Sequence, residues 1–82
     1  TWKLVSWDGS QCDWGEYLKF SGSTLYWNNR MGGENTTYTF RRTAYGFDCS
    51  NSDESYSFVV VSHNNKRMTT ASDDGIVREW KR

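Results

Sequence analysis

The chain has 82 residues, which is enough for one small domain and too few for two independent cores. Ten Lys and Arg residues balance ten Asp and Glu residues, so the chain lacks the basic excess of a typical nucleic-acid-binding protein. The longest apolar run, residues 58–61, is far shorter than the roughly 20 residues of a transmembrane helix, and no membrane-spanning helix is expected. Aromatic residues make up 17% of the chain, and their burial can offset the small size of the core.

The dominant pattern is alternation: apolar and often aromatic residues occupy every second position of short runs. Because successive side chains of a strand point to opposite faces, each run predicts a strand with one buried and one solvated face. Clusters of Gly, Asn, Asp and Ser separate the runs and mark turns, and Asp74-Gly75 is the strongest hairpin signal among them. The predicted strands are residues 1–7, 16–21, 24–28, 36–42, 44–49, 55–62, 66–71 and 75–81.

The spacing of these strands predicts one all-β domain over residues 1–82, an antiparallel up-and-down meander that closes into a small barrel of about eight strands. Closure would remove the exposed strand edges, which no proline protects. The interior of such a barrel is either filled by side chains or holds one small ligand, and short strands rich in rings favour filling. The side chains expected inside are Trp2, Leu4, Leu18, Phe20, Leu25, Trp27, Tyr38, Phe40, Tyr45, Phe47, Tyr56, Phe58, Val60, Met68, Ile76 and Trp80.

The two cysteines permit one intrachain disulfide. Cys12 lies in a predicted loop and Cys49 at a predicted strand end, which are positions where secreted domains place such bonds. In the chain-entropy model the loop closed by this bond contributes about 4 kcal/mol to stability. We expect the disulfide, and two unrelated reduced thiols are the alternative, because the sequence does not give the distance between the two Cα atoms.

Both ends of the chain resemble a known family. TWKLVS at residues 1–6 and YLKF at 17–20 resemble the opening of the small lipocalin-like domains common in Bacteroidales secreted proteins, which begin with Gly-Thr-Trp-Lys-Leu and continue into a Leu-x-Phe strand. FVVVS at 58–62, KRMT at 66–69 and DGIVREWKR at 74–82 resemble the final three strands of that family. The resemblance covers nearly the whole chain through short motifs.

This resemblance implies a lipocalin-like barrel in a secreted or cell-envelope protein, periplasmic or a surface lipoprotein. In the wider lipocalin pattern, a first-strand Trp closes one end of the barrel and a basic residue near the C-terminus packs across it. Carried over, Trp2 is the plug, and Arg82 or Arg78 is its partner through a cation–π contact. The function implied is the binding of a small hydrophobic ligand at the open end, or a lipoprotein module of unknown partner.

No pattern in the sequence predicts catalysis, a cofactor or a metal site. His63 is the one histidine and lies in a polar turn, with no His or Cys at metal-ligand spacing. The acids Glu16, Glu34 and Glu79 have polar neighbours, which does not favour the desolvated carboxylate of a glycosidase pair. We therefore expect a non-catalytic protein.

Aromatic residues outside the expected core are the candidate binding residues. Trp7, Trp14 and Tyr26 fall opposite the core positions or in the first long loop, and a small apolar ligand is expected to enter between them and Trp27. Alternatively, Trp7 and Trp14 fold back and cap the barrel mouth. The second functional hypothesis is a glycan- or protein-interaction domain that uses its outer aromatic surface, with a filled barrel. The oligomeric state is not predicted.

Overall fold

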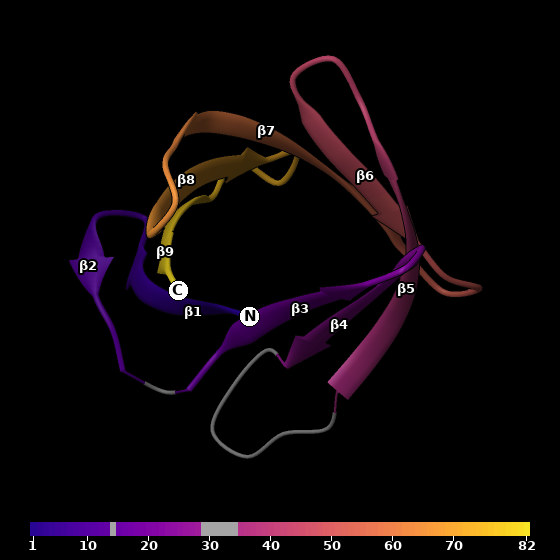
Figure 1. Ribbon diagram of the computed structural model, residues 1–82, viewed down its shortest axis with the longest axis horizontal. Helices are drawn as coiled ribbons and strands as arrows, with labels where there is room; N and C mark the ends of the chain where they lie inside the picture. Colours follow the sequence, from indigo (N-terminus) through magenta and orange to yellow (C-terminus); the bar gives the residue numbers. More distant parts are fainter. Residues whose placement is uncertain (14, 29–34) are drawn as a thin grey trace.

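The computed structural model describes residues 1–13, 15–28 and 35–82. Within these residues every regular element is a β-strand, and the predicted all-β fold is confirmed (Figure 1). The described strands are β1 (Trp2–Trp7), β2 (Ser10–Gln11), β3 (Tyr17–Ser21), β4 (Thr24–Asn28), β5 (Asn35–Arg42), β6 (Gly46–Ser50), β7 (Ser55–His63), β8 (Arg67–Ser72) and β9 (Val77–Lys81).

Pairing between the first and last strands closes the sheet. From β3 to β9 each strand pairs antiparallel with the next in sequence, and β1 pairs with both β3 and β9. In the described residues this gives an eight-stranded ring, visible as the continuous band in Figure 1, with β2 as one additional strand. The predicted antiparallel up-and-down meander that closes into a small barrel of about eight strands is therefore confirmed.

Strand β2 is the one described strand that the sequence analysis missed. It has two polar residues, too few to show an alternating pattern. Asp8 and Gly9 have positive φ angles of 51° and 88°, as in the tight turns that connect hairpins, and they return the chain onto the end of β1. The eight predicted strands all have counterparts whose limits differ by at most two residues, the largest differences being later starts for β6 and β9.

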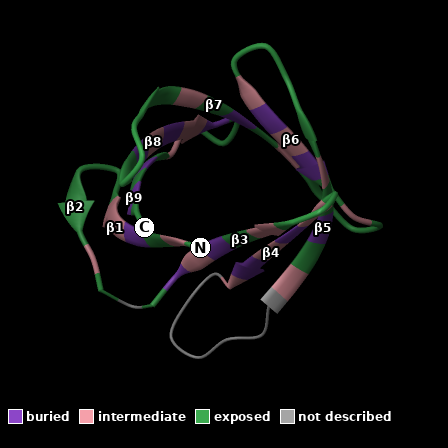
Figure 2. Cartoon of the chain, in the orientation of Figure 1, coloured by how far each residue is buried: buried purple, intermediate pink, exposed green. Residues whose placement is uncertain are grey.

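Each of the eight strands of the ring contributes buried residues to the core, and both residues of β2 are exposed (Figure 2). Rings make up much of it: Phe47 stacks on Phe58 with centroids 4.8 Å apart, and Trp27 meets Phe58 edge-on at 5.5 Å. The prediction that Tyr45 and Ile76 lie in the interior is wrong. Tyr45 is 79% exposed because β6 begins after it, and Ile76 precedes β9 and lies outside the core cluster. The buried core residues are Leu4, Leu18, Leu25, Trp27, Tyr38, Phe47, Cys49, Phe58, Met68 and Trp80.

Two irregularities in the pairing change which side chains face inward. The register of β1 against β9 shifts between Leu4 and Ser6, and that of β7 against β8 shifts between Val60 and Ser62. Each extra residue reverses the alternation beyond it. Cross-strand partners share a face, so the shifts place Trp7 on the face of buried Arg78, and His63 on the face of buried Met68.

The predicted disulfide between Cys12 and Cys49 is absent from the structure, where both thiols are free. The backbone N–H of Cys12 donates to the Val5 carbonyl at 3.1 Å, which fixes Cys12 beside β1. Cys49 is buried in β6, which lies four strands from β1 in either direction around the ring. A disulfide requires Cα atoms within about 7 Å, and opposite walls of a barrel are farther apart. The stability gain calculated from loop closure applies only if the two Cα atoms lie within bonding distance, and the sequence does not give that distance.

Thiol titration tests this correction. In denaturant without reductant we expect two reactive thiols per chain, and one for the Cys49→Ala variant. In the native protein at pH 8 the thiol of Cys49 should stay unreactive, because burial raises its pKa to about 11 and the thiolate is the nucleophile. Finding no thiol in the unreduced, denatured protein would establish the disulfide.

Gly46 allows β6 and β7 to approach closely, and its replacement tests the packing between them. A Cβ at this position would overlap the carbonyl oxygen of Phe58 on the neighbouring strand. We expect Gly46→Ala to lower the free energy of unfolding by about 3 kcal/mol, measured by urea denaturation. The matched control is Gly9→Ala, where the added methyl group meets no atom within 4 Å and the positive φ alone costs about 1 kcal/mol. Equal losses for the two variants would contradict the close approach.

Candidate functional site

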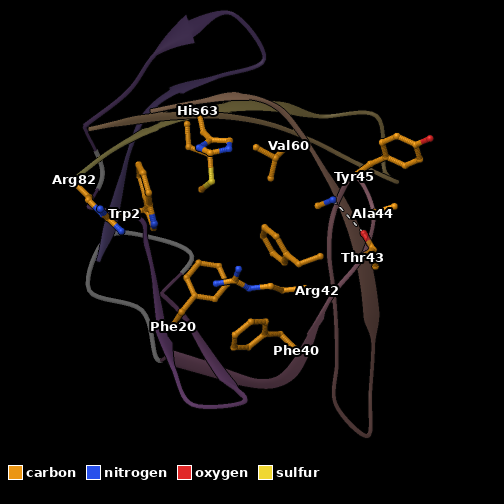
Figure 3. Close-up of a pocket in the computed structure, with 13 residues that line it drawn as sticks. Trp2, Phe20, Phe40, Arg42, Thr43, Ala44, Tyr45, Val60, His63 and Arg82 are labelled. Carbon is orange, nitrogen blue, oxygen red and sulfur yellow. Dashed lines mark hydrogen bonds between the residues drawn. The ribbon is translucent and has the colours of Figure 1, made fainter. Parts of the chain in front are cut away.

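A cavity of about 590 Å³ opens at the end of the barrel where β1 begins, here called the Trp2 end. Its volume falls within the range of about 300–1,000 Å³ that small-molecule sites occupy. Figure 3 shows its lining side chains gathered from strands on all sides of this opening. The lining residues are Trp2, Phe20, Phe40, Arg42, Thr43, Ala44, Tyr45, Gly46, Phe47, Val60, His63, Met68 and Arg82.

Three phenylalanines form the apolar wall of the cavity. Phe20 on β3 meets Phe40 on β5 edge-on with centroids 4.9 Å apart, and meets Phe47 on β6 at 5.2 Å. Phe47 is buried, whereas Phe20 and Phe40 are only half-buried and leave ring surface open to the cavity. This surface can remove an apolar ligand from water without rearrangement of the core.

Trp2 and Arg82 form one side of the opening. The guanidinium carbon of Arg82 lies 4.7 Å from the centre of the Trp2 ring, within the range of a cation–π contact. The backbone N–H of Arg82 donates to the Lys66 carbonyl at 3.0 Å, and its Nη1 donates to the Asn65 carbonyl at 3.3 Å. The contact implied by the family resemblance is therefore present, with Arg82 as the partner of Trp2. Trp2 is half-buried and borders the cavity.

The charges that line the cavity all have one sign. Arg42 and Arg82 carry positive charges, and no Asp or Glu belongs to the lining. Tyr38, Phe40 and Arg42 occupy alternate positions of β5, so Arg42 shares the inward face of the two rings. In Figure 3 the Arg42 side chain reaches across the opening toward Phe20. The Trp2 end thus combines an apolar wall with a positively charged mouth.

The opposite end of the barrel, here called the Glu16 end, contains a buried ion pair. Glu16 is 4% exposed and Arg78 is 7% exposed, with Arg78 Nε 3.7 Å from Glu16 Oε2. Trp27 Nε1 donates to the same Glu16 oxygen at 2.9 Å, and its ring lies 5.3 Å from the Arg78 guanidinium carbon. Arg78 Nη1 also donates to Ser72 Oγ at 2.9 Å. These contacts place Arg78 in a structural role with Trp27, not with Trp2.

Glu54 forms a second group of hydrogen bonds, whose two tyrosine rings pack against Trp27. One of its carboxylate oxygens accepts a hydrogen bond from the Tyr38 hydroxyl and the other from the Tyr56 hydroxyl, each at 2.9 Å. Burial and the hydrogen bond to Glu54 raise the pKa of Tyr38, so both hydroxyls stay protonated donors at neutral pH. At the Glu16 end most of these polar groups form hydrogen bonds with one another, and among the described residues Arg78 Nε is buried without a hydrogen-bond partner.

The predicted ligand-binding set does not converge on one site. Tyr26 and Trp27 are adjacent on β4 and face opposite sides, with Trp27 in the core and Tyr26 outside. Trp7 shares the inward face of Arg78 at the Glu16 end, away from the cavity lining. Trp14 lies outside the described residues, as does Glu34. The three described residues of the predicted mouth, Trp7, Tyr26 and Trp27, are therefore not brought together, and the cavity lies at the other end of the barrel from Trp7.

The sequence analysis did not identify the positions of three residues: Arg42 and His63 at the cavity, and Glu16 at the opposite end. Arg42 follows the inward positions 38 and 40 at the end of a predicted strand, so the alternation itself carried the signal for an inward cation. Glu16 was assigned polar surroundings, and its burial depends on partners 11 and 62 residues along the chain, at Trp27 and Arg78. His63 ends β7 instead of lying in a turn, because the shift in register extends the strand.

Comparison of the chain with protein-family models, curated proteins and solved structures gave no match. Among the described residues, no helix has the length and apolarity needed to cross a membrane. In the same part of the chain, no group of three or more His, Cys, Asp or Glu side chains is placed to hold a metal ion. The case for function therefore depends on the geometry of the cavity.

The buried ion pair predicts a particular pattern of stability. Glu16→Gln should lower the free energy of unfolding by about 3 kcal/mol, because the buried Arg78 charge then keeps only the partly exposed Asp74, 4.0 Å from its Nη2, as a counter-charge. The double variant Glu16→Gln with Arg78→Met removes both charges and should recover most of this loss, as measured by chemical denaturation. A double variant less stable than the single one would show that the two side chains do not compensate each other.

Proposed function

We propose that this protein is a non-catalytic binding module of a secreted or cell-envelope protein, and that a small apolar ligand occupies the cavity at the Trp2 end. The observation that carries this proposal is the cavity of about 590 Å³ bordered by the half-exposed rings of Phe20 and Phe40. The ring surface that faces this opening remains in contact with water, and a bound apolar ligand would bury it.

The arrangement of the two ends supports binding at the Trp2 end. At the Glu16 end the buried side chains of Trp27, Arg78 and Glu16 contact one another. At the Trp2 end the inward side chains stand around a space and leave it open to solvent (Figure 3). A concave, largely preformed site with apolar walls and a few polar groups at its rim is typical of small-molecule binding.

Titration with an environment-sensitive apolar fluorophore tests the proposal. We expect saturable one-to-one binding, with quenching of tryptophan fluorescence because Trp2 borders the cavity. Val60→Trp places a large ring in the cavity and should weaken binding by about tenfold or more, which corresponds to at least about 1.4 kcal/mol. The matched control is Val59→Trp, which adds the same ring at the neighbouring, outward position of β7.

The two variants also separate the cavity from the outer surface. If Val59→Trp weakens binding and Val60→Trp does not, the ligand lies on the outer face, as in the alternative of a glycan- or protein-interaction domain. Absence of saturable binding by the folded wild-type protein would overturn the proposal. Thermal denaturation of each variant establishes that it is folded under the conditions of the titration.

A further inference from the structure

We propose that the ligand of this cavity is an anionic amphiphile, an apolar chain or ring that bears one acidic oxyanion group, and that Arg42 binds that group. This inference rests on the proposed function and adds the chemical class of the ligand. The chain as a whole has equal numbers of acidic and basic residues, yet the cavity lining contains two arginines and no acid. An uneven distribution of this kind attracts anions to the opening.

Arg42 has the position that such a ligand requires. It occupies the last residue of β5, on the inward face, and its cross-strand partner is Phe47 in the cavity wall. In the part of the chain that the structure describes, no ion pair and no side-chain hydrogen bond involves Arg42. Its guanidinium therefore retains its donors for a ligand while its side chain extends over the apolar space (Figure 3).

The neighbouring Arg41 shows the opposite arrangement. Both arginines are exposed, but Arg41 points outward from the same strand and lies 3.4 Å from the Asp48 carboxylate. One arginine of the pair is thus matched with an acid on the outer surface, and the other faces the cavity without one. An arginine that lines the cavity without an acidic partner is available to bind an anion there through charge-assisted hydrogen bonds.

Arg82 strengthens the field at the opening without being the principal ligand contact. Its guanidinium is held against the Trp2 ring and donates to the Asn65 carbonyl, so part of its donor capacity is occupied. Its charge still lies in the cavity lining. Two cations at the mouth and three phenylalanines in the wall match a molecule whose charged group stays near water while its apolar part is buried.

The test compares ligands that share one apolar chain and differ in the head group: decanoate, decyl phosphate and decanol. Each is measured by displacement of the apolar fluorophore at low ionic strength, below its own micelle concentration. We expect at least one of the two anions to bind about tenfold more tightly than decanol, since hydrogen bonds to charged groups are the stronger kind. The anion that binds more tightly distinguishes a carboxylate from a phosphate source.

Arg42→Gln and Arg41→Gln provide the matched pair of variants. Each removes one positive charge from β5, and only the first removes it from the cavity. Arg42→Gln should reduce the preference for the anion to less than about threefold and leave decanol affinity within about twofold of wild type. Arg41→Gln should retain the preference.

The outcomes separate this inference from the proposed function. If the fluorophore and decanol bind and the anions bind no better, the head-group inference is wrong and the apolar site stands. If Arg41→Gln reduces the preference as much as Arg42→Gln, the effect comes from net charge and the assignment to Arg42 is overturned. If neither the fluorophore nor decanol binds, the proposed function fails, and this inference fails with it.

Discussion

Pairing of β1 with β9 is the constraint on which the rest of the structure depends. It converts a meander of neighbouring hairpins into a ring, so that every described strand of the barrel has a partner on both sides. Closure also defines an interior, because each strand must then direct alternate side chains into one shared space. The strands of the ring have five to nine residues, so that space is short, and different side chains line its two ends.

The two ends differ because their inward side chains differ in shape and in the groups that they can bond. At the Glu16 end, Trp27 is large and rigid, and Glu16 supplies one acceptor for both the Trp27 indole and the Arg78 charge. A buried ion pair without such additional bonds would be costly, so the hydrogen bonds from Trp27 and to Ser72 are what make the burial of Arg78 tolerable. The resulting contacts direct most polar groups of this end at one another, and Arg78 Nε, 3.7 Å from Glu16 Oε2, contributes its charge without a hydrogen bond.

Alternation made the fold predictable from the sequence, and long-range partners limited the prediction of the site. Positions 38, 40 and 42 follow one face of a strand without reference to any other segment, which is why the strands and most of the core were correct. The inward turn of Trp7 depends on a shift of register that only the pairing with β9 reveals. The prediction of the disulfide was wrong for a related reason. Cys12 and Cys49 each occupy a position typical of disulfides, and only the order of strands around the ring shows that they lie on opposite walls of the barrel.

The cavity follows from the kinds of side chain that close the Trp2 end. Val60 is short, and Arg42 and Arg82 are long, flexible and charged, so their heads remain near water and do not pack into the apolar space beneath. Aromatic or leucine side chains at these positions would continue the core to the end of the barrel. Arginines at these positions reduce the apolar surface that is buried on folding, and a domain of 82 residues buries a smaller fraction of its surface than a larger one. The open volume and its positive rim therefore have the same cause. Arg42 and Arg82 occupy inward positions at which the alternation of the strands predicts apolar residues.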